Sequence, residues 1–212
     1  MCTERQPPPG QASTAAEVTL RALGWRLDAL QTRRTPESHR LGVAPAAGRR
    51  DLQPHLQWRA QQIQSLIKAI NDPIDSNPEL KVKRALLHSI PGLGERTTAM
   101  LLACYADPSR FANSRPAAAF AGLDPRQRES GTSLKAKPRL SKVGHAFLRK
   151  ALYMPAMVSL YKTKWGQQVK ERLALSSKPA KLIIGAMMRK LLQVAFGVLK
   201  SEKNFDPALH GA

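Results

Sequence analysis

The sequence has few cysteines, the residues that form disulfide bonds and that often bind zinc. It contains 2 cysteines among 212 residues. Cys2 lies near the N-terminus and Cys104 in an apolar stretch with helical spacing, so we predict neither a disulfide framework nor a zinc site. Aromatic residues make up only 5% of the chain. Recognition of single-stranded bases by stacking alone is therefore disfavoured.

Long apolar runs are also missing. No stretch of about 18 apolar residues occurs, and residues 1–19 lack the apolar core of a signal peptide. No segment combines a basic face with exposed aromatic residues and leucines, which disfavours binding to an anionic membrane. We therefore expect a soluble, cytoplasmic, nucleoid-associated protein with no membrane partner.

Acidic residues are scarce relative to basic ones. The chain has 34 Lys and Arg against 15 Asp and Glu, for a formal charge of +19. Such an excess favours a polyanionic partner, and DNA is the one we expect. The acids Asp107, Asp124, Glu129 and Glu171 are scattered, with no close carboxylate pair at helical spacing. We therefore predict no metal site and no cofactor in this chain.

The spacing of apolar residues predicts an all-α fold. The leucines at 20, 23, 27 and 30 predict a helix that ends near Pro36, and residues 41–50 read as a linker or hinge. A heptad-like seam follows, which a helical hairpin, a dimeric coil or a plain amphipathic helix would bury. Arg59 occupies one seam position, where it either weakens the coil or lets its stem pack while its head reaches water. The other seam residues are Leu52, Leu56, Ile63, Leu66 and Ile70.

The second half of the chain predicts a compact helical domain. A helix over 79–88 is followed by Pro91-Gly92-Leu93-Gly94, which suggests a helix-hairpin-helix. Its free backbone amides, Gly92, Gly94 and the nearby Arg96 would form a phosphate cradle, although a purely structural corner with Leu93 in the core is the alternative. The predicted organisation is a disordered tail over 1–19, a helical linker or coiled coil over 20–78, the compact domain over 79–205 and a tail over 206–212.

More helices are predicted towards the C-terminus. One over 115–121 is stopped by Gly122. Another is capped by Ser141, kinked or interrupted at Pro155, and has outward-facing Lys142, Arg149 and Lys150. Helices over 165–175 and 178–200 complete the domain. The expected core residues of this region are Val143, Phe147, Leu148, Ala151, Leu152, Leu182, Ile183, Ala186, Met187, Leu191, Val194 and Val198.

The most basic stretch, residues 126–149, is predicted to be a loop that leads into a helix. It holds seven cations against the single acid Glu129. Such a loop can hold phosphodiesters, and the hydroxyl of Ser130 beside Gly131 could attack a phosphate that the guanidinium groups neutralise. An ordinary turn with solvated charges is the alternative. The seven cations are Arg126, Arg128, Lys135, Lys137, Arg139, Lys142 and Arg149.

Several motifs in a fixed order resemble the C-terminal transposase domain of the IS-one-ten family of bacterial insertion sequences. The coil resembles the linker of that family, through Leu27-Asp-Ala-Leu and Trp58-Arg-Ala-Gln-Gln-Ile. The domain motifs are Ser-Ile-Pro-Gly-Leu-Gly (89–94), Phe-Ala-Gly-Leu-Asp-Pro (120–125), Ser-Gly-Thr-Ser (130–133), Ser-Lys-Val-Gly (141–144), Leu-Arg-Lys-Ala-Leu-Tyr-Met-Pro-Ala (148–156) and Met-Arg-Lys-Leu-Leu (188–192).

The resemblance implies DNA transposition or site-specific recombination. Family members combine an N-terminal RuvC-like domain, whose four acids bind Mg²⁺, with a C-terminal serine that attacks DNA. They use a structured guide RNA and act as oligomers. Carried over, the nucleophile is Ser130, with Ser133 as runner-up, and Arg126, Arg128 and Arg139 stabilise the phosphoryl transition state.

The residues before the coil resemble no part of the family's metal-binding domain. They are rich in Pro and Ala and show no strand pattern with embedded acids. We therefore expect a truncated transposase, which could borrow acids from a second copy or from a full-length transposase. The alternative is a catalytically inactive nucleic-acid-binding remnant.

Overall fold

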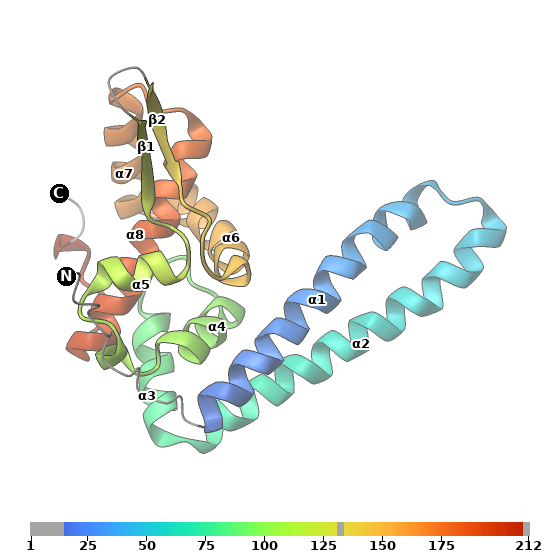
Figure 1. Ribbon diagram of the computed structural model, residues 1–212. Coiled ribbons are helices and arrows are strands. Elements are labelled where there is room, and N and C mark those ends of the chain that lie inside the picture. The colour runs from blue at the N-terminus through green and yellow to red at the C-terminus, as the bar shows by residue number, and fades with distance from the viewer. Residues whose placement is uncertain (1–14, 131–133, 210–212) are drawn as a thin grey trace, which may run out of the picture.

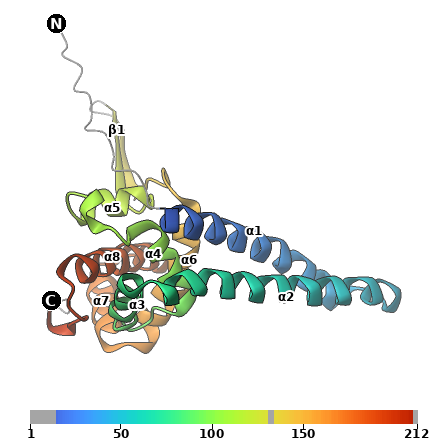
Figure 2. The ribbon, with the colours of Figure 1, turned by 90° about the horizontal axis from the view of Figure 1, so that it is seen from below.

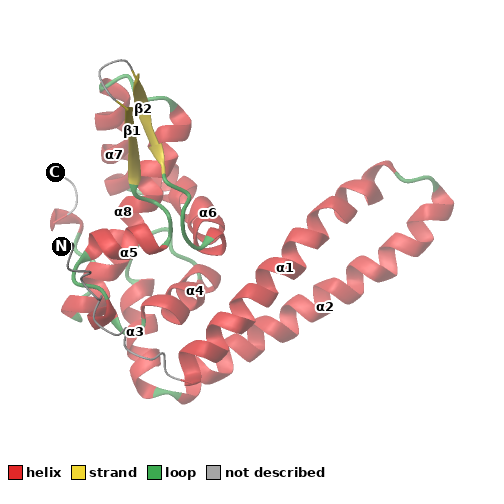
Figure 3. Ribbon diagram, viewed as in Figure 1, coloured by secondary structure: helices red, strands yellow, loops and turns green. Residues whose placement is uncertain are grey.

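The computed structural model describes residues 15–130 and 134–209. Helices dominate these residues, which confirms the all-α prediction, and one small two-stranded sheet is added to them (Figure 3). The α-helices are α1 (Ala15–Val43), α2 (Ala46–Ser76), α3 (Pro78–His88), α4 (Glu95–Tyr105), α5 (Ser114–Phe120), α6 (Ala146–Lys162), α7 (Lys164–Leu175) and α8 (Ala180–Ser201), and the strands are β1 (Pro125–Ser130) and β2 (Leu134–Leu140).

The first two helices form a long hairpin that projects from the rest of the molecule (Figure 1). The predicted helix end near Pro36 is wrong, because α1 starts at Ala15 and continues through Pro36 to Val43. Pro36 has no N–H to donate to the backbone carbonyl four residues earlier. Because Pro36 is exposed, water can hydrogen-bond to that carbonyl. The break between the helices is shorter than the predicted linker over 41–50 and spans residues 44–45.

The seam of α2 packs against α1. Ile63 and Ile70 are buried, and Leu20 and Leu27 of α1 are each 1% exposed. The head of Arg59 does not reach water as expected. Its Nη2 lies 3.4 Å from Oε1 of Glu37 on α1, and its side chain is 13% exposed. An interhelical ion pair therefore occupies the seam position that Arg59 takes.

The compact domain is built around α4 and α8. Nine consecutive residues of α4, from Thr97 to Tyr105, are buried. Helix α8 is long and apolar enough to cross a membrane by length and composition, but 61% of its apolar window is buried inside the domain. Figure 2 shows α8 lying behind α4 and α6, where its apolar face forms the core. This position accounts for its hydrophobicity.

The predicted turn between helices is present, and it is fixed by contacts on its inner side. Gly92 has a φ of +99°, and a Cβ there would lie 2.3 Å from Oγ of Ser159 on α6. That hydroxyl donates a hydrogen bond to the carbonyl of Pro91 at 3.1 Å. Leu93 is 8% exposed, as expected for a core residue. The turn is therefore at least a structural corner, and its role as a helix-hairpin-helix stays a prediction.

The predicted basic loop is instead a β-hairpin. Strands β1 and β2 pair antiparallel, with a register irregularity between Arg126 and Arg128. Arg and Lys alternate with other residues along these strands, a pattern of period two that the high charge concealed. In Figure 2 the β-hairpin extends away from the helices of the domain, on the side of α5 and opposite α7.

Four predicted details of the C-terminal helices are wrong. Ser141 does not cap α6, because α6 begins at Ala146 and the Ser141 hydroxyl donates to Oδ1 of Asp124 at 2.5 Å. Val143 is 68% exposed, since it lies in the loop before the helix. Pro155 is buried inside an uninterrupted α6. Leu182 is 41% exposed because it lies on the outer face of the first turn of α8.

Candidate nucleic-acid interface

The β-hairpin places two of the predicted phosphate-binding residues opposite each other. Arg126 is the register partner of Arg139, and both side chains are exposed. Like charges directly across an antiparallel pair repel each other and destabilise the strands. An anion bound between these guanidinium groups would relieve that repulsion. The hairpin therefore suits a polyanion at this point.

The candidate nucleophile lies at the far end of the same hairpin. Ser130 is the last residue of β1, and its register partner is Leu134. Its runner-up, Ser133, lies outside the described residues. Arg128, Lys135 and Lys137 belong to the strands, so the backbone brings these residues into the one element that carries Ser130.

The base of the hairpin is tied to the domain by polar contacts. The Ser141 hydroxyl bonds to Asp124, and the Ser141 amide donates to the Asp124 carbonyl at 2.9 Å. Nη1 of Arg149 donates to the carbonyls of Ala121 at 2.9 Å and Gly144 at 3.3 Å. The expectation that Arg149 faces out is therefore wrong, because its guanidinium turns back onto the chain. Lys142 is exposed and has a positive φ of 56°.

An aromatic cluster supports the same region. The ring of His145 lies 4.4 Å from that of Phe120 and 5.6 Å from that of Phe147, measured between centroids. Burial lowers the pKa of His145, and the nearby charges of Arg21 and Arg149 lower it further. The protein therefore favours the neutral imidazole of His145 more than water does.

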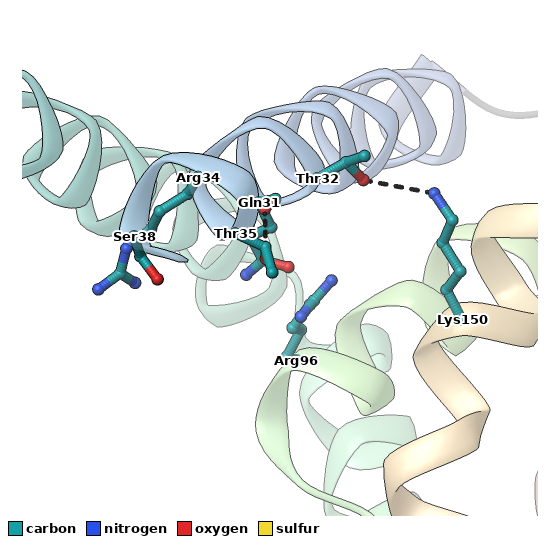
Figure 4. A pocket seen from close by; sticks show the side chains of 7 residues that line it. All are labelled: Gln31, Thr32, Arg34, Thr35, Ser38, Arg96 and Lys150. Atoms are coloured by element: carbon teal, nitrogen blue, oxygen red, sulfur yellow. Dashed lines mark hydrogen bonds between the residues drawn. The ribbon is translucent and has the colours of Figure 1, made fainter. Parts of the chain in front are cut away.

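The second group of predicted residues lies at the start of α4. Gly94 is the N-cap of this helix, no side chain caps its amides, and a Cβ at Gly94 would meet open space. Arg96 follows in the first turn and lies beside α1 and α6 rather than beside the β-hairpin (Figure 4). Sequence reasoning missed its neighbours Arg34 and Lys150 as site candidates, because one was assigned to a helix end and the other to an outer face.

Metal ligands do not gather in the described part of the chain. No group of three or more His, Cys, Asp or Glu side chains lies close enough to hold an ion there. The described residues therefore do not fit the Mg²⁺ that the resemblance implies for intact family members. The chemistry to consider is that of cations and a serine hydroxyl.

Comparison with known proteins identifies the domain that carries this site. Residues 84–171 match the model of the transposase IS116/IS110/IS902 family. Residues 84–171 therefore form a domain that is similar to the transposase domain of this family. The matched residues run from α3 into α7 and include the whole β-hairpin with both strands.

The chain is also similar in sequence to several curated proteins. Over 138 residues the chain is 37% identical to a protein named pilin gene-inverting protein from Moraxella lacunata, covering 65% of this chain and 43% of the relative. A protein of the same name from Moraxella bovis matches with the same identity and coverage. An uncharacterized insertion element IS110 protein from Streptomyces coelicolor is 25% identical over 159 residues, covering 74% of this chain and 39% of the relative. The chain spans less than half the length of these relatives.

Proposed function

We propose that this chain binds DNA and supplies the serine-bearing part of a DNA transposase or recombinase. The single observation that supports this best is the exposed, opposed pair Arg126 and Arg139 on the β-hairpin, within the residues that match the transposase family model. Phosphate contacts from Arg and Lys supply the affinity and fix the register of such a protein on its DNA. Ser130 is the last residue of β1 in the same hairpin.

The proposed reaction is a transesterification at Ser130. Its Oγ attacks a DNA phosphorus and loses its proton to water, and an Oγ–P bond forms. The bond from that phosphorus to the neighbouring nucleotide oxygen breaks, and this oxygen leaves as a hydroxyl after taking up a proton. Attack on the phosphoserine by the hydroxyl of another strand reverses the process and joins the new ends. The arginines neutralise charge on the equatorial oxygens.

A complete reaction requires more than this chain's described residues provide. The described residues hold no cluster of metal ligands. In the proposal, a second copy or a full-length transposase supplies the acids, and a structured RNA selects the target. The lack of a metal-ligand cluster among these residues also favours the alternative function, in which the β-hairpin binds nucleic acid but catalyses no reaction.

A covalent-adduct assay separates the two functions. The purified chain is incubated with labelled duplex DNA from an element end, the flanking transcript and Mg²⁺, with and without a full-length relative. Denaturing electrophoresis then detects a protein–DNA adduct. We expect an adduct that Ser130→Ala abolishes while DNA affinity stays nearly unchanged, because one hydroxyl adds little to a phosphate-dominated interface.

Two other results would change the assignment. An adduct that survives in Ser130→Ala but disappears in Ser133→Ala would move the nucleophile to Ser133. Salt-sensitive DNA binding without an adduct, even with the full-length relative present, would leave the binding function alone.

A further inference from the structure

A polar pocket lies where the helical hairpin meets the compact domain. It has a volume of about 440 Å³, within the range of roughly 300–1,000 Å³ that ligand sites occupy. Figure 4 shows α1 on one side of it, with the start of α4 and the side chain of Lys150 on α6 facing it from the other. The lining residues are Gln31, Thr32, Arg34, Thr35, Ser38, Arg96 and Lys150.

The chemistry of the lining selects an anion. Three of the seven lining residues are cations, three carry hydroxyls, one is an amide and none is an acid. Arg34 and Arg96 have no hydrogen bond or ion pair with any other side chain that the structure describes. An apolar ligand would find little surface to contact in such a pocket. A phosphate, with several acceptor oxygens, matches the donors.

Charge compensation within the pocket is incomplete. Nζ of Lys150 lies 2.9 Å from Oδ2 of Asp28, so one of the three cations is paired. The same Nζ donates to Oγ1 of Thr32 at 3.4 Å, which leaves the threonine proton free to be donated elsewhere. Burial lowers the pKa of Arg96, and the charge of Asp28 only partly opposes this effect. Arg96 nevertheless stays exposed to solvent, so an incoming anion can reach its guanidinium.

Two further features point to a ligand with acceptor and donor groups. The amide oxygen of Gln31 is buried without a hydrogen-bond partner among the described residues. Flipping the side-chain amide of Gln31 would exchange its oxygen and nitrogen, so that its NH₂ group would take the position of the oxygen and could donate to a ligand. Arg96 lies in the first turn of α4, whose N-terminal amides no side chain caps. Glu95 in the same turn offsets part of the positive helix end, so the side-chain cations carry the argument.

We propose that this pocket binds a backbone phosphate of a nucleic acid, as a contact separate from the β-hairpin. The inference rests on the proposed DNA-binding function and adds a second anchoring point to it. The pocket is formed by α1 together with α4 and α6, so a phosphate bound there joins the helical hairpin to the compact domain. Nucleic acid bound both in this pocket and on the β-hairpin would fix how the helical hairpin of α1 and α2 is oriented relative to Ser130.

The test measures affinity against salt concentration for the double variant Arg34→Gln/Arg96→Gln. Neither arginine has a hydrogen bond or ion pair with another described side chain, and glutamine keeps part of the aliphatic stem, so we expect the fold to be retained. Fluorescence anisotropy follows the full chain binding a labelled DNA duplex and, in a second arm, an RNA hairpin of equal length. The matched control, Lys68→Gln/Lys81→Gln, also removes two exposed cations, and neither of them lines the pocket.

The expected effect follows from counterion release. Each lost phosphate contact lowers the slope of log affinity against log salt by about 0.9 on duplex DNA. We expect affinity at 0.1 M salt to fall about 8-fold if the two arginines share one phosphate and about 60-fold if each contacts its own. A loss on DNA alone or on RNA alone identifies which nucleic acid enters the pocket. The control variant should lose much less.

The outcomes separate this inference from the function on which it rests. Wild-type chain that binds neither DNA nor RNA would overturn both. Wild-type binding that the pocket variant keeps, with an unchanged salt slope, would overturn the pocket alone. Equal losses in the pocket variant and in the control would also overturn it, because net charge would then explain the effect.

Discussion

Replacing Gly92 by alanine tests how the turn between α3 and α4 is held. The φ of +99° is strained for any residue with a Cβ, and the new Cβ would lie 2.3 Å from Oγ of Ser159. The strain costs about 1–3 kcal/mol. Ser159 is fully buried and bonds to the Pro91 carbonyl. Moving its hydroxyl away would leave that carbonyl unpaired, at a further cost of about 1–3 kcal/mol.

The predicted loss of unfolding free energy for Gly92→Ala is therefore about 2–6 kcal/mol, a large part of the roughly 5–15 kcal/mol of a typical protein. Urea unfolding followed by tryptophan fluorescence and circular dichroism measures it. Gly94→Ala is the matched control, because Gly94 has a negative φ of −96° and open space around its Cβ position. We expect that variant to lose at most about 1 kcal/mol, from a poorer N-cap.

A double-mutant cycle with Ser159→Ala separates the strain from the collision. Without the hydroxyl of Ser159, Gly92→Ala should cost only the backbone strain, so the two substitutions should couple by about 1–2 kcal/mol. A cost below about 1 kcal/mol for Gly92→Ala alone would refute the reasoning. So would an identical cost in both backgrounds.

Three further predictions concern the hairpin and its base. Arg126→Gln/Arg139→Gln should lower the salt slope of DNA binding by about 0.9, since the two guanidinium groups share one phosphate, without lowering thermal stability, since it removes a cross-strand repulsion; a lower Tm with unchanged binding would contradict it. Ser141→Ala should cost about 1–2 kcal/mol in urea unfolding, through its lost bond to Asp124, and should leave adduct formation intact; loss of the adduct at full stability would contradict this structural role. Because the folded-state pKa of His145 is depressed, the folded state binds fewer protons, so unfolding free energy should fall as pH drops below about 6.5; His145→Phe should weaken this dependence, and an unchanged pH profile would count against it.

The sequence predicted those parts of the fold in which periodicity and burial agree. The leucine stripe of α1 and the seam of α2 lie at helical spacing and face each other, as expected. Arg59 was harder to place, because its partner Glu37 comes from another helix and pairing across helices leaves no local signal. Pro36 misled the prediction because an exposed proline can remain in a helix when water takes up the freed carbonyl.

The sequence predicted which basic residues belong to the candidate site, but not how they are arranged in space. Cations dominate residues 126–140, and that density predicts phosphate binding in a loop as well as in a strand. The pairing of Arg126 with Arg139 depends on a register that only the folded hairpin fixes. The pocket around Arg96 depends on α1 and α6, which lie far from it in sequence, so no local motif could reveal it.

The most direct test of the account is the Ser130→Ala comparison in the adduct assay, with DNA affinity measured on the same samples. The account predicts a wild-type adduct that disappears in the variant while the affinity changes by less than about twofold. Loss of binding in proportion to loss of adduct would contradict the assignment of Ser130 as nucleophile, because the residue would then act in holding DNA or in the fold.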